Sequence, residues 1–521
     1  MRRVILARKP MLIALCAVGI GGVAPAASPT ASGAPAAAFR VVSPCPFPTG
    51  AVPESRLTCG FLDVPESAAH PSARRLRIPV ARIRASGPAP RPDPVVFLHG
   101  GPGTGPLGLT GHTVERFAAH PFAVDRDIIL FNQRGSPATD PPLSCAALDA
   151  GRIGIYADDI DLGVRDARIT AAAVGCLEEI AAAGRDLAAY SATAAAADLE
   201  ALRLALGIER WNLLAVSYGT LIALEAARVD GAGVRSLVLD SVVSPGSDLF
   251  MSEGPRNFSW GIDRLLAGCE ADASCAADFP DVAGQLRSVI ESLRARPVKV
   301  TVAGPGGEGS IELTVNWHDF LGAIHWMLYN AKSLRLVPLL VASTHRGDLR
   351  VLTYVMDHVF PAPRNGAGGA SPAFFAFVCR DQFTRDVPRP PAASNPAWRG
   401  FSIVSFVDEV CAQVVKDRAS RLPPLKSAVP ALLFSGRFDP MTPGIYAREV
   451  AAGLPSATLV EVGDSGHSTL SAFDSCQTRL AVEFLATLRP PTACRPQEAR
   501  PVFVRSYSGN TIVRRPSTMM R

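Results

Sequence analysis

The sequence contains no Cys-x-x-Cys motif, although it has 11 cysteines, and it shows no internal repeat. Zinc sites and thioredoxin-like redox sites commonly use that motif, so its absence argues against both classes of site. We expect neither a metal ion nor a cofactor.

The chain carries little net charge outside its N-terminal end. Its formal charge is +5, and Arg2, Arg3, Arg8 and Lys9 contribute four of these charges. The rest of the chain has a formal charge of about +1, because no acidic residue lies among those four. A nearly neutral body gives no electrostatic basis for binding nucleic acid, so we expect no nucleic-acid partner.

The N-terminal segment has the organisation of a secretory signal peptide. Arg2–Lys9 is positive, Met11–Val23 is apolar but too short to span a bilayer comfortably, and Ala24-Pro25-Ala26 offers small residues for cleavage. We predict a signal peptide over residues 1–26 and an Ala/Pro/Ser-rich linker over residues 27–40. The alternative is an uncleaved anchor. Cleavage would give a secreted or periplasmic protein without a stable membrane span.

The cysteine content agrees with export. Cys16 lies inside the predicted signal peptide, which leaves ten cysteines in the mature chain. An even number of cysteines in an exported protein favours disulfides over buried free thiols.

Apolar runs that alternate with helical patterns predict a mostly parallel sheet with helices on both faces. The predicted strands are Leu76–Val80, Val95–Leu98, Ile128–Phe131, Trp211–Val216, Leu237–Val243, Ala431–Phe434 and Thr458–Val462. Helical patterns dominate the interval before the last two strands, where one apolar helix face comprises Trp317, Phe320, Leu321, Ile324 and Leu328. We predict an α/β core over 41–245 and 428–495, a mainly helical cap over 246–427 and a mobile tail over 496–521.

Ser217 lies between a predicted strand and a predicted helix, in Ala215-Val216-Ser217-Tyr218-Gly219. A serine on such a strand–turn–helix elbow exposes its hydroxyl at the end of the sheet, where it can act as a nucleophile. The usual pattern has glycine where this chain has Ala215. The pentapeptide alone is weak support, because short Ser/Gly runs also occur in ordinary loops.

Asp439 and His467 complete a catalytic triad in the chain order of the α/β-hydrolase fold. Asp439 follows the strand at 431–434, and His467 follows the next strand. Histidine can accept the serine proton near neutral pH, and the aspartate orients the imidazole. Asp240, at the end of another strand, and Asp464, near the histidine, are alternative carboxylates. Taken singly, Asp439 could be a turn residue and His467 a surface-loop histidine.

The loop His99-Gly100-Gly101-Pro102-Gly103 follows a strand and suits an oxyanion hole, because glycines let the backbone approach a substrate closely. The backbone N–H of Tyr218, directly after the nucleophile, would supply one donor. Residues 103–108 also match the dinucleotide pattern Gly-x-Gly-x-x-Gly. However, no helix opens after them, so no helix N-terminus is present to hold a pyrophosphate.

Five motifs together resemble the proline iminopeptidase and tripeptidyl aminopeptidase group of α/β-hydrolases. They are His-Gly-Gly-Pro-Gly, Asn-Gln-Arg-Gly, Val-Ser-Tyr-Gly-Thr, Gly-Arg-Phe-Asp-Pro-Met-Thr-Pro and Gly-His-Ser, and Asp198, Leu199 and Arg203 also look like that group. The resemblance runs from about Cys45 to Cys494, and the secreted tripeptidyl branch is the more similar one. Asn132 stands where that group often has aspartate.

The resemblance implies several further features. Gly101 would be the second oxyanion donor, and residues 428–495 would be the TAP-like C-terminal segment. Asp381 would bind the substrate's free amine, although it could instead pair with Arg380 or Arg385 on the surface. The simplest disulfide pairing, which resembles that of the secreted peptidases, joins Cys45–Cys59, Cys145–Cys176, Cys269–Cys275, Cys379–Cys411 and Cys476–Cys494.

By this resemblance the substrate would be a peptide that loses N-terminal residues through an acyl-enzyme. The same machinery would also suit an esterase acting on a small molecule, because the cap selects the substrate. A third class is a catalytically silent binding protein. The sequence leaves the oligomeric state open.

Overall fold

The computed structural model describes residues 37–71, 74–108, 111–145, 148, 161–304, 309–359, 371–384, 395–398, 400–471 and 474–506. The predicted signal peptide over 1–26 and most of the predicted linker over 27–40 lie outside these ranges. The linker prediction extends too far at its end, because strand β1 spans Ala38–Val42. Its backbone is held there by antiparallel pairing with β2 (Leu57–Pro65).

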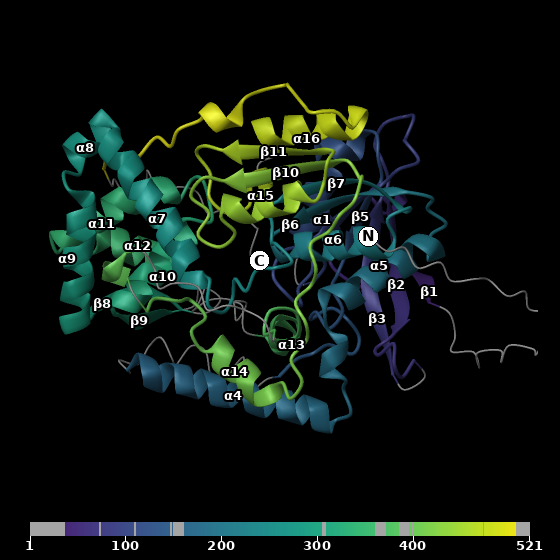
Figure 1. Cartoon of the computed structure of the whole chain (residues 1–521), viewed down its shortest axis with the longest axis horizontal. Helices are drawn as coiled ribbons and strands as arrows, with labels where there is room; N and C mark the ends of the chain where they lie inside the picture. The colour runs from purple at the N-terminus through teal and green to yellow at the C-terminus, as the bar shows by residue number, and fades with distance from the viewer. Residues whose placement is uncertain are drawn as a thin grey trace, which may run out of the picture. The chain divides into compact units, whose positions relative to one another are not determined.

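Nine strands of the described chain form one sheet in the order β1-β2-β3-β5-β4-β6-β7-β10-β11 (Figure 1). The pairs from β1 to β5 are antiparallel, and every pair from β5 to β11 is parallel. The further strands are β3 (Arg75–Ile83), β4 (Val95–Leu98), β5 (Ile128–Phe131), β6 (Trp211–Val216), β7 (Val234–Asp240), β10 (Ala431–Gly436) and β11 (Ala457–Val462). The mostly parallel sheet that the sequence predicts is therefore present.

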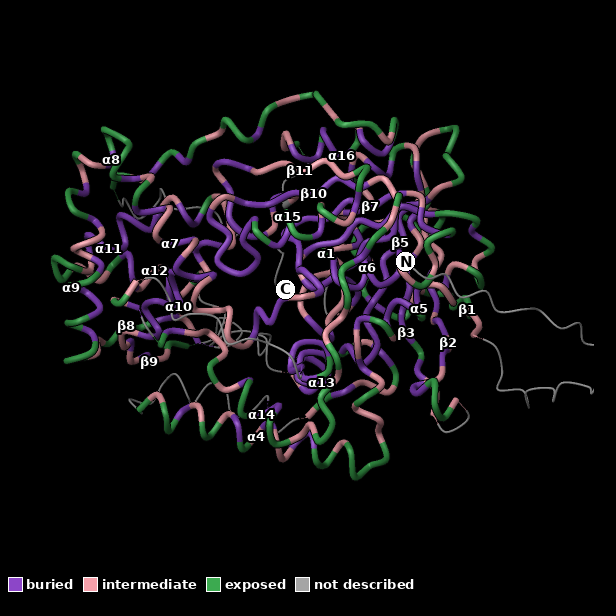
Figure 2. Tube along the Cα trace, in the orientation of Figure 1, coloured by how far each residue is buried: buried purple, intermediate pink, exposed green. Residues whose placement is uncertain are grey.

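Helices cover both faces of this sheet. Successive residues of each inner strand point to opposite faces and enter two different apolar cores. In β4, Val96 and Leu98 belong to one core, whereas Val95 and Phe97 belong to the other. The first core includes the helices α5 (Ala192–Ala205), α6 (Tyr218–Val229) and α15 (Gly444–Ala452), and the second includes α1 (His112–Ala118) and α16 (Cys476–Thr487). Burial on two faces explains why the inner strands read as continuous apolar runs (Figure 2).

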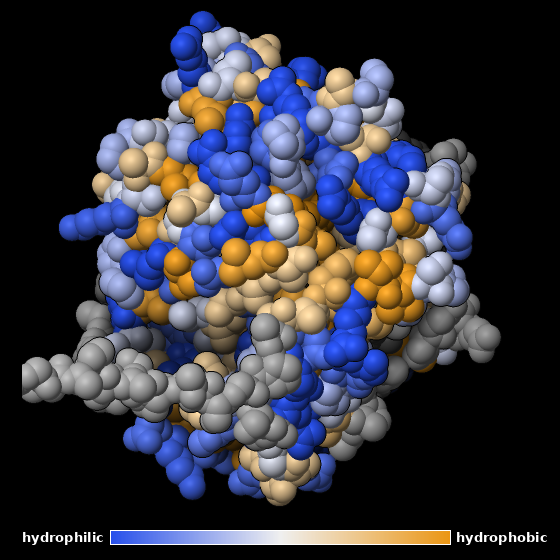
Figure 3. Space-filling view, turned by 90° about the vertical axis from the view of Figure 1, so that its right-hand side faces the viewer, coloured by the Kyte–Doolittle hydropathy of each residue, from blue (hydrophilic) through white to orange (hydrophobic). Residues whose placement is uncertain are grey.

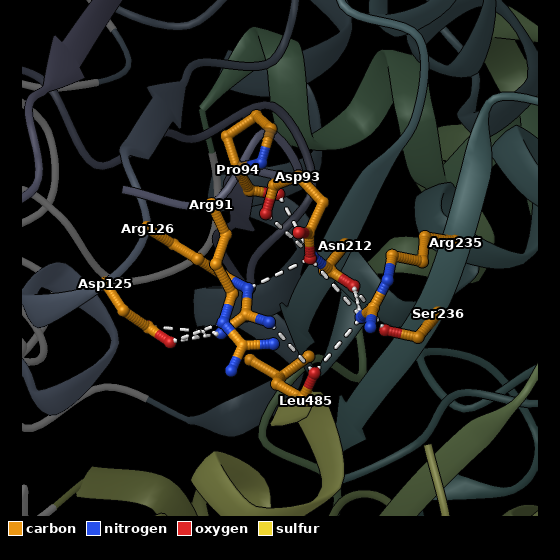
Figure 4. A network of polar contacts seen from close by, with 9 residues as sticks. All are labelled: Arg91, Asp93, Pro94, Asp125, Arg126, Asn212, Arg235, Ser236 and Leu485. Atoms are coloured by element: carbon orange, nitrogen blue, oxygen red, sulfur yellow. Dashed lines mark hydrogen bonds and ion pairs between the residues drawn. The ribbon is translucent and has the colours of Figure 1, made fainter. Parts of the chain in front are cut away.

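A polar network ties strands together at the amino end of the sheet (Figure 4). The Asp93 carboxylate accepts hydrogen bonds from Arg126 at 3.0 Å and from Asn212 at 2.9 Å, and Arg235 lies 3.3 Å away. Both arginines also donate to the backbone carbonyl of Leu485 in α16. The network therefore joins β4, β6 and β7 to α16 and leaves the carboxyl end of the sheet open for other side chains.

The interval between β7 and β10, which includes the predicted cap, is mainly helical. Its buried residues from 258 to 356 share an apolar core of their own, whereas those at 373–379 and 407–411 belong to the first core of the sheet. It forms α7 (Gly254–Ala271), α8 (Ala273–Asp278), α9 (Val282–Ala295), β8 (Val298–Ala303), β9 (Ser310–Val315), α10 (Trp317–Met327), α11 (Val337–His345), α12 (Arg350–His358), α13 (Pro372–Asp381) and α14 (Val407–Val414). Helix α4 (Leu162–Ala182), which the sequence analysis did not predict, packs on α14. Its Arg165 donates to Asp319 of α10 at 2.9 Å.

The described part of the predicted mobile tail, residues 496–506, is packed against the rest of the chain. Gly463 donates a backbone hydrogen bond to Pro496 at 3.0 Å, and Val504 donates one to Arg335 at 3.0 Å. Phe503 is 8% exposed and belongs to the core of the helical interval. The prediction of a mobile tail therefore fails for these residues, because a buried aromatic side chain anchors them.

The ten cysteines form five disulfides, Cys45–Cys59, Cys145–Cys176, Cys269–Cys275, Cys379–Cys411 and Cys476–Cys494. These pairs are the ones that the order of the cysteines suggests. In the described part of the chain, no helix is both long and apolar enough to cross a membrane.

The face that Figure 3 shows carries an apolar band among hydrophilic residues. In the described residues, large exposed apolar side chains include Val41 of β1 and Leu204 of α5. Scattered exposed apolar residues of this kind are ordinary on protein surfaces and indicate no partner by themselves.

Candidate active site

Ser217 occupies a sharp turn between β6 and α6. Its backbone has φ 54° and ψ −128°, a conformation that costs a non-glycine residue about 1–3 kcal/mol. A Cβ atom on Gly219 would lie 2.3 Å from the carbonyl oxygen of Leu98, so only glycine lets α6 pack this closely on β4. Ala215 is fully buried in β6 and accommodates its methyl group within the sheet. Ser217 is partly exposed, as a nucleophile on such an elbow would be.

Asp439 and His467 form a buried pair at the carboxyl ends of β10 and β11. The Nδ1 atom of His467 lies 3.0 and 2.9 Å from the two carboxylate oxygens of Asp439. Burial opposes ionisation of Asp439, but the charge of His467 and hydrogen bonds from the Thr442 and Met441 backbone hold its pKa below its usual value. The side chains are 0% and 3% exposed, respectively. The aspartate is therefore arranged to stay ionised and to orient the imidazole.

The two alternative carboxylates have other partners. Asp240 accepts hydrogen bonds from the Thr469 hydroxyl and the Leu470 backbone, both at 2.9 Å. Asp464 forms an ion pair with Arg335 at 3.5 Å. Asp439 is thus the carboxylate that contacts the ring of His467.

Asp240, at the end of β7, connects the turn at Ser217 to the loop that carries His467. Its backbone carbonyl accepts the Ser217 N–H at 2.9 Å, while its carboxylate holds the segment that follows His467. Within the described residues, the Ser217 hydroxyl and the His467 ring make no hydrogen bond with each other. Such catalytic hydrogen bonds are often long without substrate and shorten when substrate binds.

The predicted oxyanion loop passes directly against Ser217. A Cβ atom on Gly100 would lie 2.8 Å from the Ser217 Cβ atom, and Gly101 has φ +79°. The Thr104 hydroxyl lies 2.6 and 2.8 Å from the carbonyl oxygens of Gly100 and Gly101, which orients both peptide groups. Tyr218, the other predicted donor, is the first residue of α6.

Gln133 holds this loop in place, and the sequence analysis did not assign it a role. Its side-chain oxygen accepts the Gly103 N–H at 2.7 Å, and its side-chain nitrogen donates to the carbonyls of His99 at 3.1 Å and Gly101 at 3.0 Å. The sequence feature that could have indicated this role is the Asn-Gln-Arg-Gly run after β5. Its neighbour Asn132 exchanges two hydrogen bonds with the Leu107 backbone.

The third member of that run, Arg134, bonds to a different part of the chain. Its buried guanidinium donates to the two carboxylate oxygens of Asp198 at 2.7 and 2.8 Å. The pairing is bidentate, which fixes the geometry of both groups. Asn132 and Gln133 therefore support the turn around the predicted oxyanion hole, whereas Arg134 ties the end of β5 to α5.

Asp381 lies inside the protein, on α13, and not at the surface. Its carboxylate accepts hydrogen bonds from the Tyr218 hydroxyl and from the Ala192 backbone N–H at the start of α5. Burial raises its pKa to about 7, although the hydrogen bond from Tyr218 acts in the opposite direction. Arg385, one of its expected alternative partners, is outside the described residues. With these internal partners, an amine-binding role for Asp381 depends on the resemblance alone.

The end of α10 covers the histidine side of the site. The backbone N–H of His467 donates to the carbonyl of Leu328 at 3.2 Å. The ring of Tyr329 is centred 4.6 Å from the His467 ring. Residues of the helical interval therefore contact His467 directly.

Two parts of the chain match known protein families. Residues 93–277 match the family described as alpha/beta hydrolase fold, and residues 402–496 match the family described as TAP-like protein. The first match includes Ser217, and the second includes Asp439 and His467.

Three known proteins illustrate the similarity. The tripeptidyl aminopeptidase of Streptomyces lividans is 30% identical over 199 residues, which cover 37% of this chain and 36% of that protein. The serine protease Hip1 of Mycobacterium tuberculosis H37Rv is 28% identical over 227 residues, 42% of each chain. The crystal structure of proline iminopeptidase from Mycobacterium smegmatis has 15% identity and a TM-score of 0.39, covering 82% of this chain and 98% of that one. The match to the tripeptidyl aminopeptidase thus spans about a third of that protein's length.

Proposed function

Because the chain has the α/β-hydrolase fold and a TAP-like segment at its C-terminal end, we propose that it is an exported serine peptidase. Its activity would be that of an aminopeptidase, which releases N-terminal residues or short peptides. Ser217, His467 and Asp439 would be its triad, with the N–H groups of Tyr218 and Gly101 as the oxyanion hole.

In the first half of this reaction, the Ser217 hydroxyl attacks the scissile carbonyl carbon and gives its proton to Nε2 of His467. The carbonyl oxygen becomes an oxyanion, which the two N–H groups stabilise by about 3 kcal/mol each. His467 then returns the proton to the leaving amine as the carbon–nitrogen bond breaks. An acyl-enzyme ester on Ser217 remains.

In the second half, His467 takes a proton from a water molecule, and the resulting hydroxide attacks the acyl-enzyme carbonyl. The proton returns to the Ser217 oxygen as the ester bond breaks. Asp439 stays ionised throughout and stabilises the imidazolium that forms twice in each cycle.

The observation that carries this proposal is the fully buried Asp439–His467 pair at 2.9 Å, on the same sheet end as the strained Ser217 elbow. An aspartate–imidazole pair at the same end of the sheet as a serine on such a turn supports the chemistry of acyl transfer. The peptidase and aminopeptidase parts of the proposal draw on the similarity to tripeptidyl aminopeptidase and to serine protease Hip1.

A matched substrate panel tests the aminopeptidase activity. The panel contains chromogenic peptides with a free N-terminus, their N-acetylated copies and simple esters of the same residues. In an aminopeptidase, a carboxylate in the pocket pairs with the protonated amine of the substrate, since a buried charge without a partner is costly. The free peptides should therefore be cleaved far faster than the acetylated ones, which carry no charge at that end. Equal rates on both forms, or activity confined to esters, would move the protein to the esterase class.

Export is proposed on the N-terminal pattern, with the five disulfides in agreement. Mass spectrometry of the protein recovered from its natural producer should find an N-terminus at residue 27. An intact N-terminus, together with free thiols, would contradict this location.

A further inference from the structure

A small cavity lies in the helical interval and reaches the loop after β10, where Met441 is two residues from Asp439. Its lining includes Leu249, Phe258, His325, Phe401 and Met441. Most of these side chains are apolar, and none of the described lining residues carries a charged side chain. The cavity has room for about one water-sized group.

His325 is the unusual member of this lining. It is 2% exposed, and neither ring nitrogen has a hydrogen-bond partner among the described residues. Its ring lies among aromatic neighbours, with centroids 5.9 Å from Phe258 and 5.5 Å from Tyr329. A buried polar side chain without a hydrogen-bond partner lowers the stability of the folded protein, so the presence of a histidine at this position needs a physical explanation.

The imidazole of His325 is held in its neutral form. Burial, and next the charge of His467, lower its pKa to about 3. A neutral imidazole has one N–H donor and one acceptor nitrogen. His325 can therefore serve either hydrogen-bonding role but offers no charge to a ligand.

The cavity borders the loop that carries Asp439, and the ring of Tyr329 connects its His325 to His467. Met441 lies two residues after Asp439, and its backbone N–H donates to that carboxylate at 2.8 Å. Tyr329 contacts the rings of both His325 and His467, at 5.5 and 4.6 Å between centroids. The ring of Tyr329 would thus separate a group bound at His325 from the imidazole of His467.

We propose that this cavity is a side-chain subsite of the substrate and that His325 determines its specificity by hydrogen bonding to a substrate hydroxyl. The inference rests on the proposed hydrolytic function of the neighbouring triad. A hydroxyl fits for three reasons: it has the size of one water-sized group, it is neutral, and it both donates and accepts. A carboxylate or an ammonium group would lack a counter-charge in this lining.

The test uses pairs of substrates that differ only by a hydroxyl. Threonine and valine have nearly the same shape, whereas alanine lacks the hydroxyl of serine altogether. Each of these residues is placed in turn at each position of a free-amine chromogenic peptide. The same pairs are supplied as N-acetyl amino-acid esters, so the preference can be read for a peptidase or an esterase. At one position the wild type should favour the hydroxyl member by about tenfold in kcat/KM.

The variant His325→Phe should reduce this ratio to about one while changing the rates on valine and alanine substrates by less than about threefold. His325→Gln, which keeps one donor and one acceptor, should retain part of the preference and guards against misfolding of the Phe variant. His345→Ala, on an exposed histidine of α11, is the matched control and should leave the ratio unchanged.

Two results would overturn the inference: no hydroxyl preference at any position in the wild type, or an unchanged preference in His325→Phe. A merely structural role would lower the melting temperature without changing the substrate ratio. Failure of the proposed function has a different signature, since no substrate of either kind would then be turned over and no serine would react with a fluorophosphonate.

Discussion

The hydroxyl of Tyr218 donates a hydrogen bond to the buried carboxylate of Asp381. Tyr218 is the first residue of α6 and the proposed oxyanion donor, whereas Asp381 ends α13. The same carboxylate accepts the Ala192 N–H at 2.8 Å. This contact links the position of the helical interval to the peptide group that would stabilise the transition state.

Asp381 should make stability depend on pH. Its pKa is about 7 in the folded protein against an ordinary value of 3.8. The folded state therefore holds this proton more tightly than the unfolded state, and its contribution to stability falls as pH rises from about 4 to about 7. The difference corresponds to at most about 4 kcal/mol. Asp381→Asn should remove this part of the pH dependence in denaturant unfolding at pH 4.5 and 7.5.

The control for this measurement is Asp417→Asn, a substitution at an exposed aspartate. It should show the same pH dependence as the wild type. If Asp381→Asn also followed the wild-type curve, Asp381 would have an ordinary pKa in the folded protein.

Asp439→Asn should lower kcat by about 10⁴-fold with little loss of folding, because the amide favours the wrong imidazole tautomer. Asp240→Asn provides the comparison, since Asp240 is equally buried but contacts Thr469 and Leu470 instead of the ring. Its turnover should fall by less than about tenfold, with the main effect on stability. A larger kinetic loss in Asp240→Asn than in Asp439→Asn would reverse the assignment of the acid.

Gln133→Ala should lower kcat by about 10- to 100-fold and change KM little, because a displaced oxyanion donor acts mainly on the transition state. The side chain makes three hydrogen bonds with the loop from His99 to Gly103. Gln413→Ala, at an exposed glutamine of α14, is the control and should retain full activity. Loss of stability in Gln133→Ala without a fall in kcat would show that the loop does not depend on Gln133 for its geometry.

Phe503→Ala should destabilise the protein by about 3 kcal/mol, because it removes a buried aromatic side chain from the core of the helical interval. Val502→Ala, one residue earlier and 74% exposed, should change stability by less than about 0.5 kcal/mol. Equal small effects in thermal or denaturant unfolding would mean that the C-terminal segment is not anchored.

The parts of the fold that could be predicted have strong local signals. β4, β5 and β6 coincide with the apolar runs at Val95–Leu98, Ile128–Phe131 and Trp211–Val216, since strands buried on both faces need continuous apolar sequence. Ser217, Asp439 and His467 could be selected because each follows a predicted strand.

The parts that could not be predicted depend on contacts between distant segments. Nothing local to Phe503 indicates that it enters the core of residues 254–356, and the Ala-rich helix α4 has only a weak apolar face. The role of Gln133 depends on three backbone groups about 30 residues earlier in the chain. Likewise, the sequence does not predict that the His325 ring lacks a hydrogen-bond partner, because its neighbours Phe258 and Phe401 come from distant segments.

The most direct measurement is fluorophosphonate labelling of the wild type and Ser217→Ala, followed by peptide mapping and an activity assay. We expect the wild type to be labelled on Ser217 and inactivated in proportion, whereas Ser217→Ala is neither labelled nor active and keeps the wild-type melting temperature. Ser274→Ala, at an exposed serine of α8, should be labelled and active like the wild type. Label on another serine, or a tenth of wild-type turnover in Ser217→Ala, would contradict the assignment of Ser217 as the nucleophile.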